Sequence, residues 1–294
     1  MSAIRYDQVH RLFVGGSKTS RPAAREKASR GTLSIVIPAK DESANLPPLL
    51  IEVMLAFRPL VGRAGGPHRL RGFEVVVVDD GSTDSTGEVL RGLAQIYPEL
   101  RPVTLARNVG QSAATVAGFR ASRGEWVGML DADLQNPPAS LAEMWDRLPG
   151  YDAALGWRER RADSRTKRIT SRLANRVRNA VLGQGIKDTG CSVRILKREL
   201  ALRLPMFGGG HRFLGPLLIR EGCRIVQLPV AHRPRTRGKS HYHFGNRSIR
   251  VVVDLLGVAW LLRRPVDYEV VAAERPAPAG SDRAFAGSAE GAWS

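Results

Sequence analysis

The sequence predicts an α/β protein with a mainly parallel sheet that is covered by helices on both faces. Two observations lead to this prediction. Apolar runs such as LSIVIPA (33–39) alternate along the chain with segments of helical periodicity, and such alternation builds parallel sheets. The run LSIVIPA also has the pattern of a buried strand.

The first half of the chain carries the clearest alternation. We expect strands over 33–39, 73–82, 102–106 and 125–133, and helices over 43–57, 85–96 and 111–122. Pro47 and Pro48 fall near the first turn of the first helix, where a missing N–H donor does little harm. Ser85 and Glu88 have the spacing of a capping box at the start of the second helix. Residues 59–72 are rich in Gly, Pro and Arg and predict a loop.

The second half of the chain is more basic. Residues 165–183 have a helical pattern in which Arg and Lys flank an apolar stripe, and residues 189–196 and 223–230 resemble strands. A basic loop is expected over 232–245. The pattern of residues 249–265 predicts a final amphipathic helix, with an apolar stripe formed by Val251, Leu255, Val258 and Leu262. Such a stripe either packs on the core or lies on a membrane surface.

These patterns divide the chain into four parts. We expect a flexible basic tail over 1–31, an α/β domain over 32–248, the amphipathic helix over 249–266 and a disordered tail over 267–294. Both tails have compositions that do not support a packed core.

The composition restricts the function classes. The chain has 294 residues and a formal net charge of +17, which favours anionic partners such as phosphates, nucleic acid or acidic lipids. Aromatic residues make up only 6% of the chain, which disfavours nucleic-acid binding by base stacking. No run of about 18 apolar residues predicts a membrane-spanning helix. Cys191 and Cys223 lack a metal-ligand spacing and are expected to be reduced, partly buried thiols.

Two of the expected strands end in acidic residues, in VVVVDDGS and in MLDADLQNPP. Asp79, Asp80, Asp131 and Asp133 therefore fall where ligands bind in open α/β sheets, beyond the carboxyl ends of the strands. Two carboxylates on alternate residues can reach one hard cation such as Mg²⁺ or Mn²⁺, and Gln135 could add a carbonyl oxygen. The alternative for each acidic segment is a plain turn. The absence of G-x-G-x-x-G after the first strand argues against a dinucleotide dehydrogenase.

The order of several motifs resembles that of family 2 glycosyltransferases with the GT-A fold, a Rossmann-like architecture. These motifs are VIPAKDESANL, VVVVDDGSTDST, LARNVGQSAATVAGF, MLDADLQNPP, DTGCSVRIL and RTRGKSHY, and the resemblance covers residues 33–265. The branch that they resemble most is that of the polyprenyl-phosphate sugar transferases, namely dolichyl-phosphate mannose synthases and bacterial undecaprenyl-phosphate glycosyltransferases.

The resemblance implies roles for several sets of residues. The nucleotide-sugar site would comprise Pro38, Ala39, Glu42, Val78, Asp79, Asp80, Asn108, Gly110, Asp131, Ala132, Asp133 and Gln135. The metal ligands would be Asp131, Asp133 and Gln135. The acceptor phosphate would meet Arg172, Asn175 and Arg176. A donor-closing loop would carry Arg235, Lys239, Ser240 and His241. The catalytic residues would be Asp133, Arg158 and Arg235.

The reaction implied is metal-dependent, inverting transfer of a sugar from a GDP- or UDP-sugar to dolichyl or undecaprenyl phosphate, with Mg²⁺ or Mn²⁺ as cofactor. The enzyme would lie in the cytoplasm against the inner face of the membrane, bound to anionic lipid or to a membrane protein. Lys40 stands where the family usually has an aromatic residue, and His241 where it usually has lysine.

Three alternatives remain at this stage. The first is a family 2 enzyme with a soluble or glycan hydroxyl acceptor, which would need a carboxylate base. Asp131, Asp133 and the acids of DDGS are the obvious candidates for that base, and Asp188 is a further candidate that also suits a structural turn. The second is a nucleic-acid-binding module, which lacks a recognisable motif. The third is an inactive scaffold, which the intact acidic motifs argue against.

Overall fold

The computed structural model describes residues 29–63, 68–159, 176, 178–183, 185–234 and 247–264. Within these residues the strands are β1 (Ser29–Ala39), β2 (His68–Asp79), β3 (Leu100–Thr104), β4 (Trp126–Met129), β5 (Ala153–Arg158), β6 (Arg194–Lys197) and β7 (Ile225–Val230). The α-helices with assigned bounds are α2 (Leu46–Phe57), α3 (Thr86–Ile96), α4 (Gln111–Ala121), α5 (Pro138–Trp145), α7 (Arg198–Arg203), α8 (Leu214–Arg220) and α9 (Arg247–Leu262). Two 3-10 helices are η1 (Arg58–Leu60) and η2 (Gly210–Phe213).

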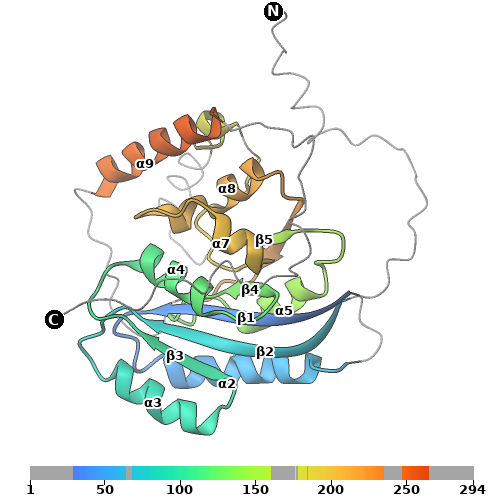
Figure 1. Cartoon of the computed structure of the whole chain (residues 1–294), viewed down its shortest axis with the longest axis vertical. Coiled ribbons are helices and arrows are strands. Elements are labelled where there is room, and N and C mark those ends of the chain that lie inside the picture. The colour runs from blue at the N-terminus through green and yellow to red at the C-terminus, as the bar shows by residue number, and fades with distance from the viewer. Residues whose placement is uncertain are drawn as a thin grey trace, which may run out of the picture.

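The described strands form one sheet in the order β3-β2-β1-β4-β6-β5-β7 (Figure 1). The strands β3, β2, β1 and β4 pair with one another in parallel, and β5 pairs with β7 in parallel. Strand β6 runs antiparallel to both β4 and β5. The predicted mainly parallel sheet is therefore confirmed, with β6 as its antiparallel member.

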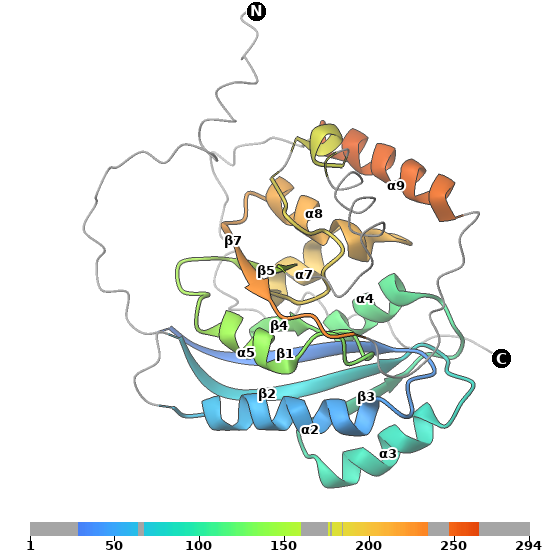
Figure 2. The same cartoon turned by 180° about the vertical axis from the view of Figure 1, so that it is seen from behind.

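Each face of the sheet carries its own apolar core, because successive side chains of a strand point to opposite faces. On β1, Ile35 and Ile37 pack into one core with α2, α3 and α5, whereas Val36 packs into the other with α4, α7 and α8. Figure 1 and Figure 2 show α2 and α3 on one side of β1 and β2, and α4, α7 and α8 on the other. Helix α4 approaches the sheet closely at Gly118, where a Cβ atom would lie 2.3 Å from Val36 Cγ1.

The pairing of β1 with β2 extends further than the sequence predicted. Strand β2 begins at His68, so the prediction of a loop over 59–72 was wrong for residues 68–72. Strand β1 begins at Ser29, within the predicted tail, and residues 29–31 pair with residues 68–70. Backbone hydrogen bonds can extend the pairing of two strands through polar residues. The pattern of apolar residues does not predict such an extension.

Other element ends also differ from the prediction. Strand β4 ends at Met129, so Asp131 and Asp133 lie in the loop beyond it, and β6 covers only the end of the predicted strand over 189–196. Ser85 is the N-cap residue of α3, but its side chain makes no capping hydrogen bond. Instead, Asp84 Oδ1 accepts a hydrogen bond from the backbone N–H of Thr86 at 3.0 Å. A carboxylate one residue upstream has replaced the predicted capping box.

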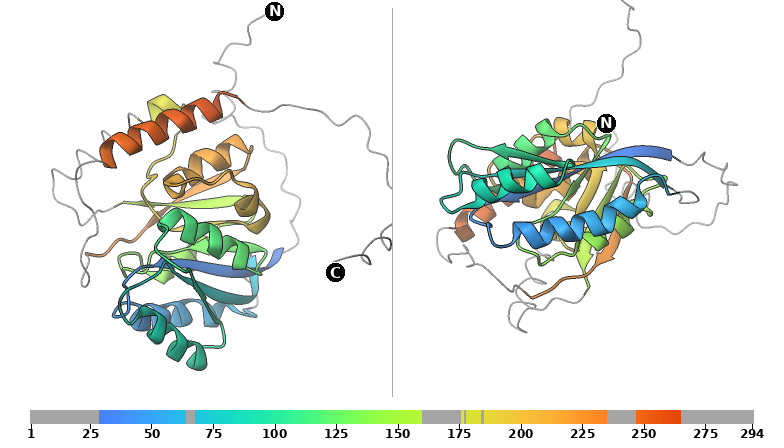
Figure 3. Two further views of the ribbon diagram at one scale, coloured as in Figure 1. Left: turned by 60° about the vertical axis from the view of Figure 1, so that its left-hand side comes forward. Right: turned by 90° about the horizontal axis from the view of Figure 1, so that it is seen from below.

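Helix α9 lies at the end of the described structure opposite α2 and α3 (Figure 3). The sequence left two alternatives for the apolar stripe of α9, and the structure shows that it packs on the core. Val258 and Ala259 are buried with Leu182 and Phe213 in a third, small cluster. The opposite side of the helix exposes further apolar residues, which are Val252, Val253, Leu256 and Trp260. None of the described helices is long and apolar enough to cross a membrane.

Both cysteines are buried free thiols, as predicted. Burial and the nearby charge of Asp188 raise the pKa of Cys191 to about 11. Residues 178–182 are helical, in agreement with the predicted basic helix. The predicted tails beyond residues 29–31, the remainder of the basic helix before residue 176, and most of the basic loop after residue 234 lie outside the described residues.

Candidate functional site

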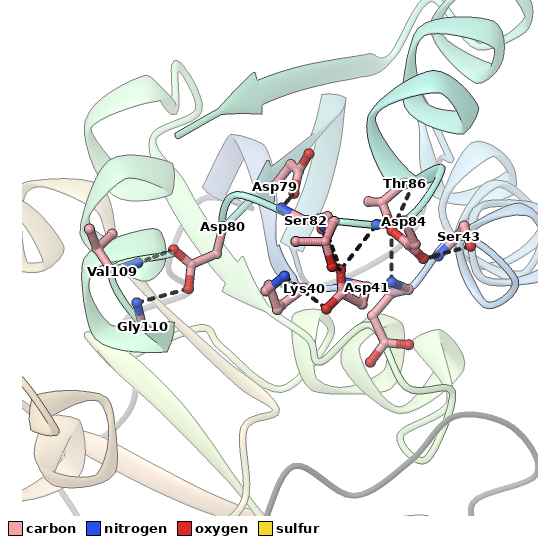
Figure 4. A network of polar contacts seen from close by, with 12 residues as sticks. Lys40, Asp41, Ser43, Asp79, Asp80, Ser82, Asp84, Thr86, Val109 and Gly110 are labelled. Atoms are coloured by element: carbon pink, nitrogen blue, oxygen red, sulfur yellow. Dashed lines mark hydrogen bonds and ion pairs between the residues drawn. The ribbon is translucent and has the colours of Figure 1, made fainter. Parts of the chain in front are cut away.

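The carboxyl ends of β1 and β2 are joined by a polar network around Asp41 (Figure 4). Asp41 Oδ1 accepts hydrogen bonds from the backbone N–H groups of Thr83 at 2.7 Å and Asp84 at 3.4 Å, and Oδ2 receives Lys40 Nζ at 2.8 Å. Burial acts to raise the pKa of Asp41, but the bonds from Lys40 and Thr83 outweigh it and lower the pKa to about 2. Lys40, the departure from the family pattern, is thus held by the neighbouring carboxylate.

Asp79, the last residue of β2, and Asp80, which follows it, are both 4% exposed and accept hydrogen bonds from backbone N–H groups. Asp79 Oδ1 accepts from the N–H of Ser82 at 2.8 Å. The two oxygens of Asp80 accept from the N–H groups of Val109 and Gly110, each at 2.8 Å (Figure 4). Asp80 therefore fixes the start of α4, a structural role that the motif alone did not reveal.

The glycine that follows these aspartates permits the loop after β2 to contact the backbone of residues 107–110. Gly81 has a φ of +60°, and a Cβ atom there would lie 2.4 Å from the carbonyl carbon of Arg107. Only glycine fits a left-handed turn pressed against another backbone. The glycine of VDDGS thus brings the β2 loop against residues 107–110.

Asp131 lies beyond β4 and accepts a hydrogen bond from a neutral donor. Gln111 Nε2, in the first turn of α4, donates to Asp131 Oδ1 at 3.0 Å, and Ser192 lies close enough to act on the pKa of the same carboxylate. Burial and the charge of Asp133 raise the pKa of Asp131 to about 6, against the opposing effects of Ser192 and two arginines. Neither Gln111 nor Ser192 was among the predicted site residues.

Asp133 and Gln135 form a tight turn after Asp131. Asp133 Oδ1 accepts from the N–H of Gln135 at 3.1 Å, and Leu134 between them has a φ of +61°. The backbone N–H of Arg233 donates to the carbonyl of Gln135 at 2.8 Å, and Gln135 Nε2 lies 3.4 Å from the carbonyl oxygen of Arg233. Metal ligation by the Gln135 amide oxygen stays a prediction.

Arg158 at the end of β5 forms a bidentate ion pair with Asp188. Nε donates to Oδ2 at 2.8 Å and Nη2 to Oδ1 at 3.1 Å, and both side chains are largely buried. The backbone N–H of Gly190 also donates to Oδ1, at 3.1 Å. Asp188 therefore orients Arg158, and the charge of Arg158 acts on Asp131.

Arg194 is a further buried cation that the sequence analysis missed. It is 4% exposed, and its guanidinium donates to the carbonyls of Cys191 at 3.0 Å, Thr189 at 2.9 Å and His211 at 2.7 Å. Its charge also lowers the pKa of Asp131. An arginine within the apolar segment VRIL was the signal available in the sequence.

The other nucleotide-site candidates lie on the same loops. Pro38 and Ala39 end β1 and pair with Val78 and Asp79 of β2. Glu42 Oε2 accepts from Asn45 Nδ2 at 2.5 Å, and the Glu42 N–H donates to Thr86 Oγ1 at 2.9 Å. Ala132 is buried and Asn108 is exposed. The structure thus brings the predicted nucleotide residues together on adjoining loops.

The acceptor-side candidates are only partly covered. Arg176 is helical and exposed, and Arg172, Asn175, Arg235, Lys239, Ser240 and His241 lie outside the described residues. Arg178, which was not predicted, contacts Thr189 Oγ1. Burial and the charge of Arg212 lower the pKa of Arg178.

The donor set suits a hard cation that is shared with a ligand. In the described part of the chain, no group of three or more His, Cys, Asp and Glu side chains is placed to hold a metal. Asp131 and Asp133 instead offer two carboxylates close enough for the charge of one to raise the pKa of the other. Mg²⁺ and Mn²⁺ often use one or two carboxylates and complete their coordination with substrate phosphates and water.

A family model described as glycosyl transferase family 2 matches residues 34–204 of the chain. The chain belongs to glycosyl transferase family 2. The match spans the acidic loops, Arg158, Ser192 and Arg194, so the site described above lies within the family domain.

Curated relatives of this family 2 chain have names that specify polyprenyl-phosphate products or acceptors. The dodecaprenyl-phosphate galacturonate synthase of Rhizobium johnstonii is 34% identical over 242 residues, which cover 79% of this chain and 67% of that protein. The undecaprenyl-phosphate 4-deoxy-4-formamido-L-arabinose transferase of Pseudomonas paraeruginosa is 37% identical, with coverage of 76% of this chain and 64% of that protein. The chain therefore spans about two thirds of the length of these relatives.

Solved structures confirm the predicted fold. A mannosyltransferase of Pyrobaculum calidifontis, determined with GDP-mannose and Mn²⁺, has a TM-score of 0.58 and 23% identity, over 85% of this chain and 69% of that chain. Glucosyl-3-phosphoglycerate synthase of Mycobacterium tuberculosis, with Mn²⁺, UDP and its product, has a TM-score of 0.57 and 24% identity, over 78% of this chain and 80% of that chain.

Proposed function

We propose that this family 2 chain transfers a sugar, with inversion, from a nucleoside diphosphate sugar to a polyprenyl phosphate. The observation that carries the proposal is that Asp131 lies close enough to Asp133, Arg158 and Arg194 for their charges to act on its carboxylate, beyond the carboxyl end of β4. Membership of family 2 and the names of the relatives support the donor and acceptor classes.

The residues of the two acidic loops would bind the donor. Asp131 and Asp133, with Gln135 as a further oxygen donor, would hold Mg²⁺ or Mn²⁺. When bound, the ion would neutralise the charge that grows on the leaving diphosphate. The nucleoside would lie along the loops after β1 and β2, with Asp79 and Glu42 at their rim. Arg158, oriented by Asp188, would add positive charge beside the diphosphate.

The environment of Asp188 favours a phosphate acceptor over a hydroxyl acceptor. A hydroxyl needs a general base, whereas a phosphate monoester is already largely dianionic at neutral pH, since its second pKa is about 6. Both oxygens of Asp188 are engaged by Arg158, so this carboxylate is poorly placed to accept a substrate proton. Arg172, Asn175 and Arg176 would orient the acceptor phosphate.

The outer side of α9 would bring the enzyme to the membrane that holds such a lipid. Val252 is 55% exposed, Val253 60%, Leu256 60% and Trp260 59%. The exposed Arg263 and Arg264 end this segment, and the guanidinium of Arg264 lies 5.2 Å from the centre of the Trp260 ring. Apolar residues beside Arg and Trp are typical of helices that lie in the membrane interface. We therefore propose peripheral association with the inner face of the membrane.

A transfer assay tests the reaction. Purified protein would be incubated with Mn²⁺ or Mg²⁺, radiolabelled UDP- and GDP-sugars in turn, and undecaprenyl or dolichyl phosphate. Label should enter the organic phase with one donor and only with metal. Label that stays aqueous while a nucleotide sugar binds would reject the lipid acceptor.

Two variants make the assay specific for the site. Asp133→Ala should abolish metal-dependent transfer and leave the thermal unfolding profile intact. The matched control is Asp146→Ala, because Asp146 lies after α5 and pairs with Arg63. Full transfer by Asp133→Ala would reject the assignment of the metal site.

A further inference from the structure

We infer that Glu52 and Arg233 are positioning residues that hold the turn over residues 133–135 in one shape before the metal binds. We call this pair the clamp. Glu52 lies on α2, and Arg233 lies beyond the end of β7. The inference rests on the proposed metal site and is independent of the acceptor. Neither residue is a proposed metal ligand, since Arg233 acts through Gln135 and Glu52 acts through Arg233.

The turn over residues 133–135 needs support from outside. Leu134 has a φ of +61°, and a residue with a side chain adopts this left-handed conformation only at an energetic cost. Within the turn, Asp133 Oδ1 accepts from the N–H of Gln135 at 3.1 Å. That bond uses an oxygen of the carboxylate that would also hold the metal. Contacts from other elements are therefore expected to keep the turn in place.

The backbone of Arg233 supplies such contacts. Its N–H donates to the carbonyl of Gln135 at 2.8 Å, and Gln135 Nε2 lies 3.4 Å from its carbonyl oxygen. Because a carbonyl oxygen only accepts hydrogen bonds, the Gln135 amide turns its nitrogen toward Arg233 and its oxygen away from it. The N–H of Ala231 also donates to Ser140 Oγ on α5, at 3.3 Å. Residues 231–233 are thus attached both to the turn and to α5.

The side chain of Arg233 joins the same segment to α2. Its Nη1 lies 2.8 Å from Glu52 Oε1 and 3.0 Å from Glu52 Oε2. The two side chains are 47% and 32% exposed, and ion pairs as exposed as this one contribute little to the stability of the whole fold. Helices α2 and α5 share one apolar core, so the segment that holds Gln135 is attached to a common base at two points.

The clamp predicts that both of its members favour metal binding. A turn that is already ordered does not have to be ordered when the metal arrives, so its loss should weaken binding. We expect Arg233→Ala and Glu52→Ala each to weaken Mn²⁺ binding by about threefold to fivefold, the range that such ion pairs allow. The thermal unfolding profile should change little in either variant.

The sign of the change in Arg233→Ala separates the clamp from simple electrostatics. Removal of a positive charge near a cation site would by itself tighten Mn²⁺ binding, and removal of the negative charge of Glu52 would weaken it. The clamp instead predicts weaker binding in both variants. The double variant Glu52→Arg, Arg233→Glu keeps the net charge and reverses the pair, so it should recover most of the lost affinity.

Mn²⁺ binding to the full chain can be measured by electron paramagnetic resonance, with UDP and with GDP. The matched controls are Arg58→Ala and Glu99→Ala. These residues form another exposed ion pair, which follows the end of α2, with Arg58 Nε 2.9 Å from Glu99 Oε1 and side chains that are 49% and 20% exposed. Both control variants should keep the wild-type affinity for Mn²⁺.

Weaker Mn²⁺ binding by Arg233→Ala, with recovery in the reversed pair, supports the clamp. Unchanged or tighter binding by Arg233→Ala, or equal losses in the Arg58 and Glu99 controls, would overturn it. A wild-type chain that binds no Mn²⁺ with either nucleotide would reject the proposed metal site and the clamp together. Equal binding by the wild type and all variants would reject the clamp alone.

Discussion

At the scale of single residues, the site is built from charges whose partners are backbone groups or other charges. Asp41, Asp79, Asp80 and Arg194 bond mainly to backbone and hold loops together. Asp131 differs from them, since its pKa is raised to about 6 by burial and by Asp133. Among these residues, Asp131 is therefore the one whose environment favours the arrival of a cation.

The raised pKa of Asp131 predicts that metal affinity depends on pH. Mn²⁺ needs the ionised carboxylate, so protons compete with it below about pH 6. We expect the Kd for Mn²⁺ to be nearly constant above neutral pH and to rise by about tenfold per unit at lower pH. Titrations should include the nucleotide sugar that supports the strongest binding, because its diphosphate does not titrate in this range. A Kd that is independent of pH between 5 and 7 would contradict the assignment.

The ion pair between Arg158 and Asp188 predicts a large loss of stability when one partner is removed. Asp188→Ala leaves a buried guanidinium without its carboxylate, and we expect a loss of about 3 kcal/mol in the free energy of unfolding. The double variant Arg158→Met, Asp188→Ala should lose less than the sum of the losses in the single variants Arg158→Met and Asp188→Ala. Urea unfolding of all four proteins measures this coupling. Additive losses would mean that the two side chains contribute independently.

At the scale of elements, the approach of α4 to the sheet depends on Gly118. A Cβ atom there would lie 2.3 Å from Val36 Cγ1, and overpacking of this kind destabilises by about 1–3 kcal/mol. We expect Gly118→Ala to be destabilising by that amount although alanine favours helices. Gly92→Ala in α3 is the control, since nothing lies within 4 Å of its added Cβ. That variant should be stabilised by about 0.5–1 kcal/mol, and equal effects in thermal unfolding would refute the packing argument.

The cap of α3 gives a second prediction at this scale. Asp84 accepts from the Thr86 N–H, and it also accepts from the N–H and hydroxyl of Ser43. Asp84→Ala should therefore lower the free energy of unfolding by about 1 kcal/mol. Ser85→Ala should change it by less than about 0.5 kcal/mol, because the Ser85 side chain makes no cap bond. Chemical denaturation distinguishes the two, and a larger effect at Ser85 would restore the capping-box interpretation.

The comparison of these elements with the sequence shows what patterning can and cannot predict. Apolar periodicity located α2, α3, α4 and the strands β1, β2 and β7, because burial imposes it. The loop over 59–72 was wrong at residues 68–72, since backbone pairing with β1 needs no apolar pattern. Gln111 and Arg194 were missed because the contacts of Gln111 with Asp131 and of Arg194 with the His211 carbonyl join segments that are distant in the sequence. The acidic motifs were recognisable because the residues that define them lie next to one another in the sequence.

At the scale of the whole molecule, the acidic loops at the carboxyl ends of the strands and the exposed apolar side of α9 lie in one structure. The chain as a whole has a formal net charge of +17. If α9 meets the membrane, anionic phosphatidylglycerol vesicles should bind the protein in a sedimentation assay. Leu256→Ser and Trp260→Ser should each reduce binding by about tenfold, since each removes an apolar side chain from the interface. Leu55→Ser is the control, because Leu55 on α2 is 71% exposed at the opposite end of the molecule. Equal losses for Leu55 and Leu256, or no binding by the wild type, would contradict this orientation.

The direction of β6 has a consequence for where function is found along the chain. In a parallel sheet the residues that follow each strand meet at one rim. Because β6 enters the sheet from that rim, with Arg194 paired to Met129, the residues that precede it take part instead. Asp188, Ser192 and Arg194 thus come to face loops that follow β4 and β5. A variant search in this family should therefore examine the segment upstream of the reversed strand as closely as those downstream of its neighbours.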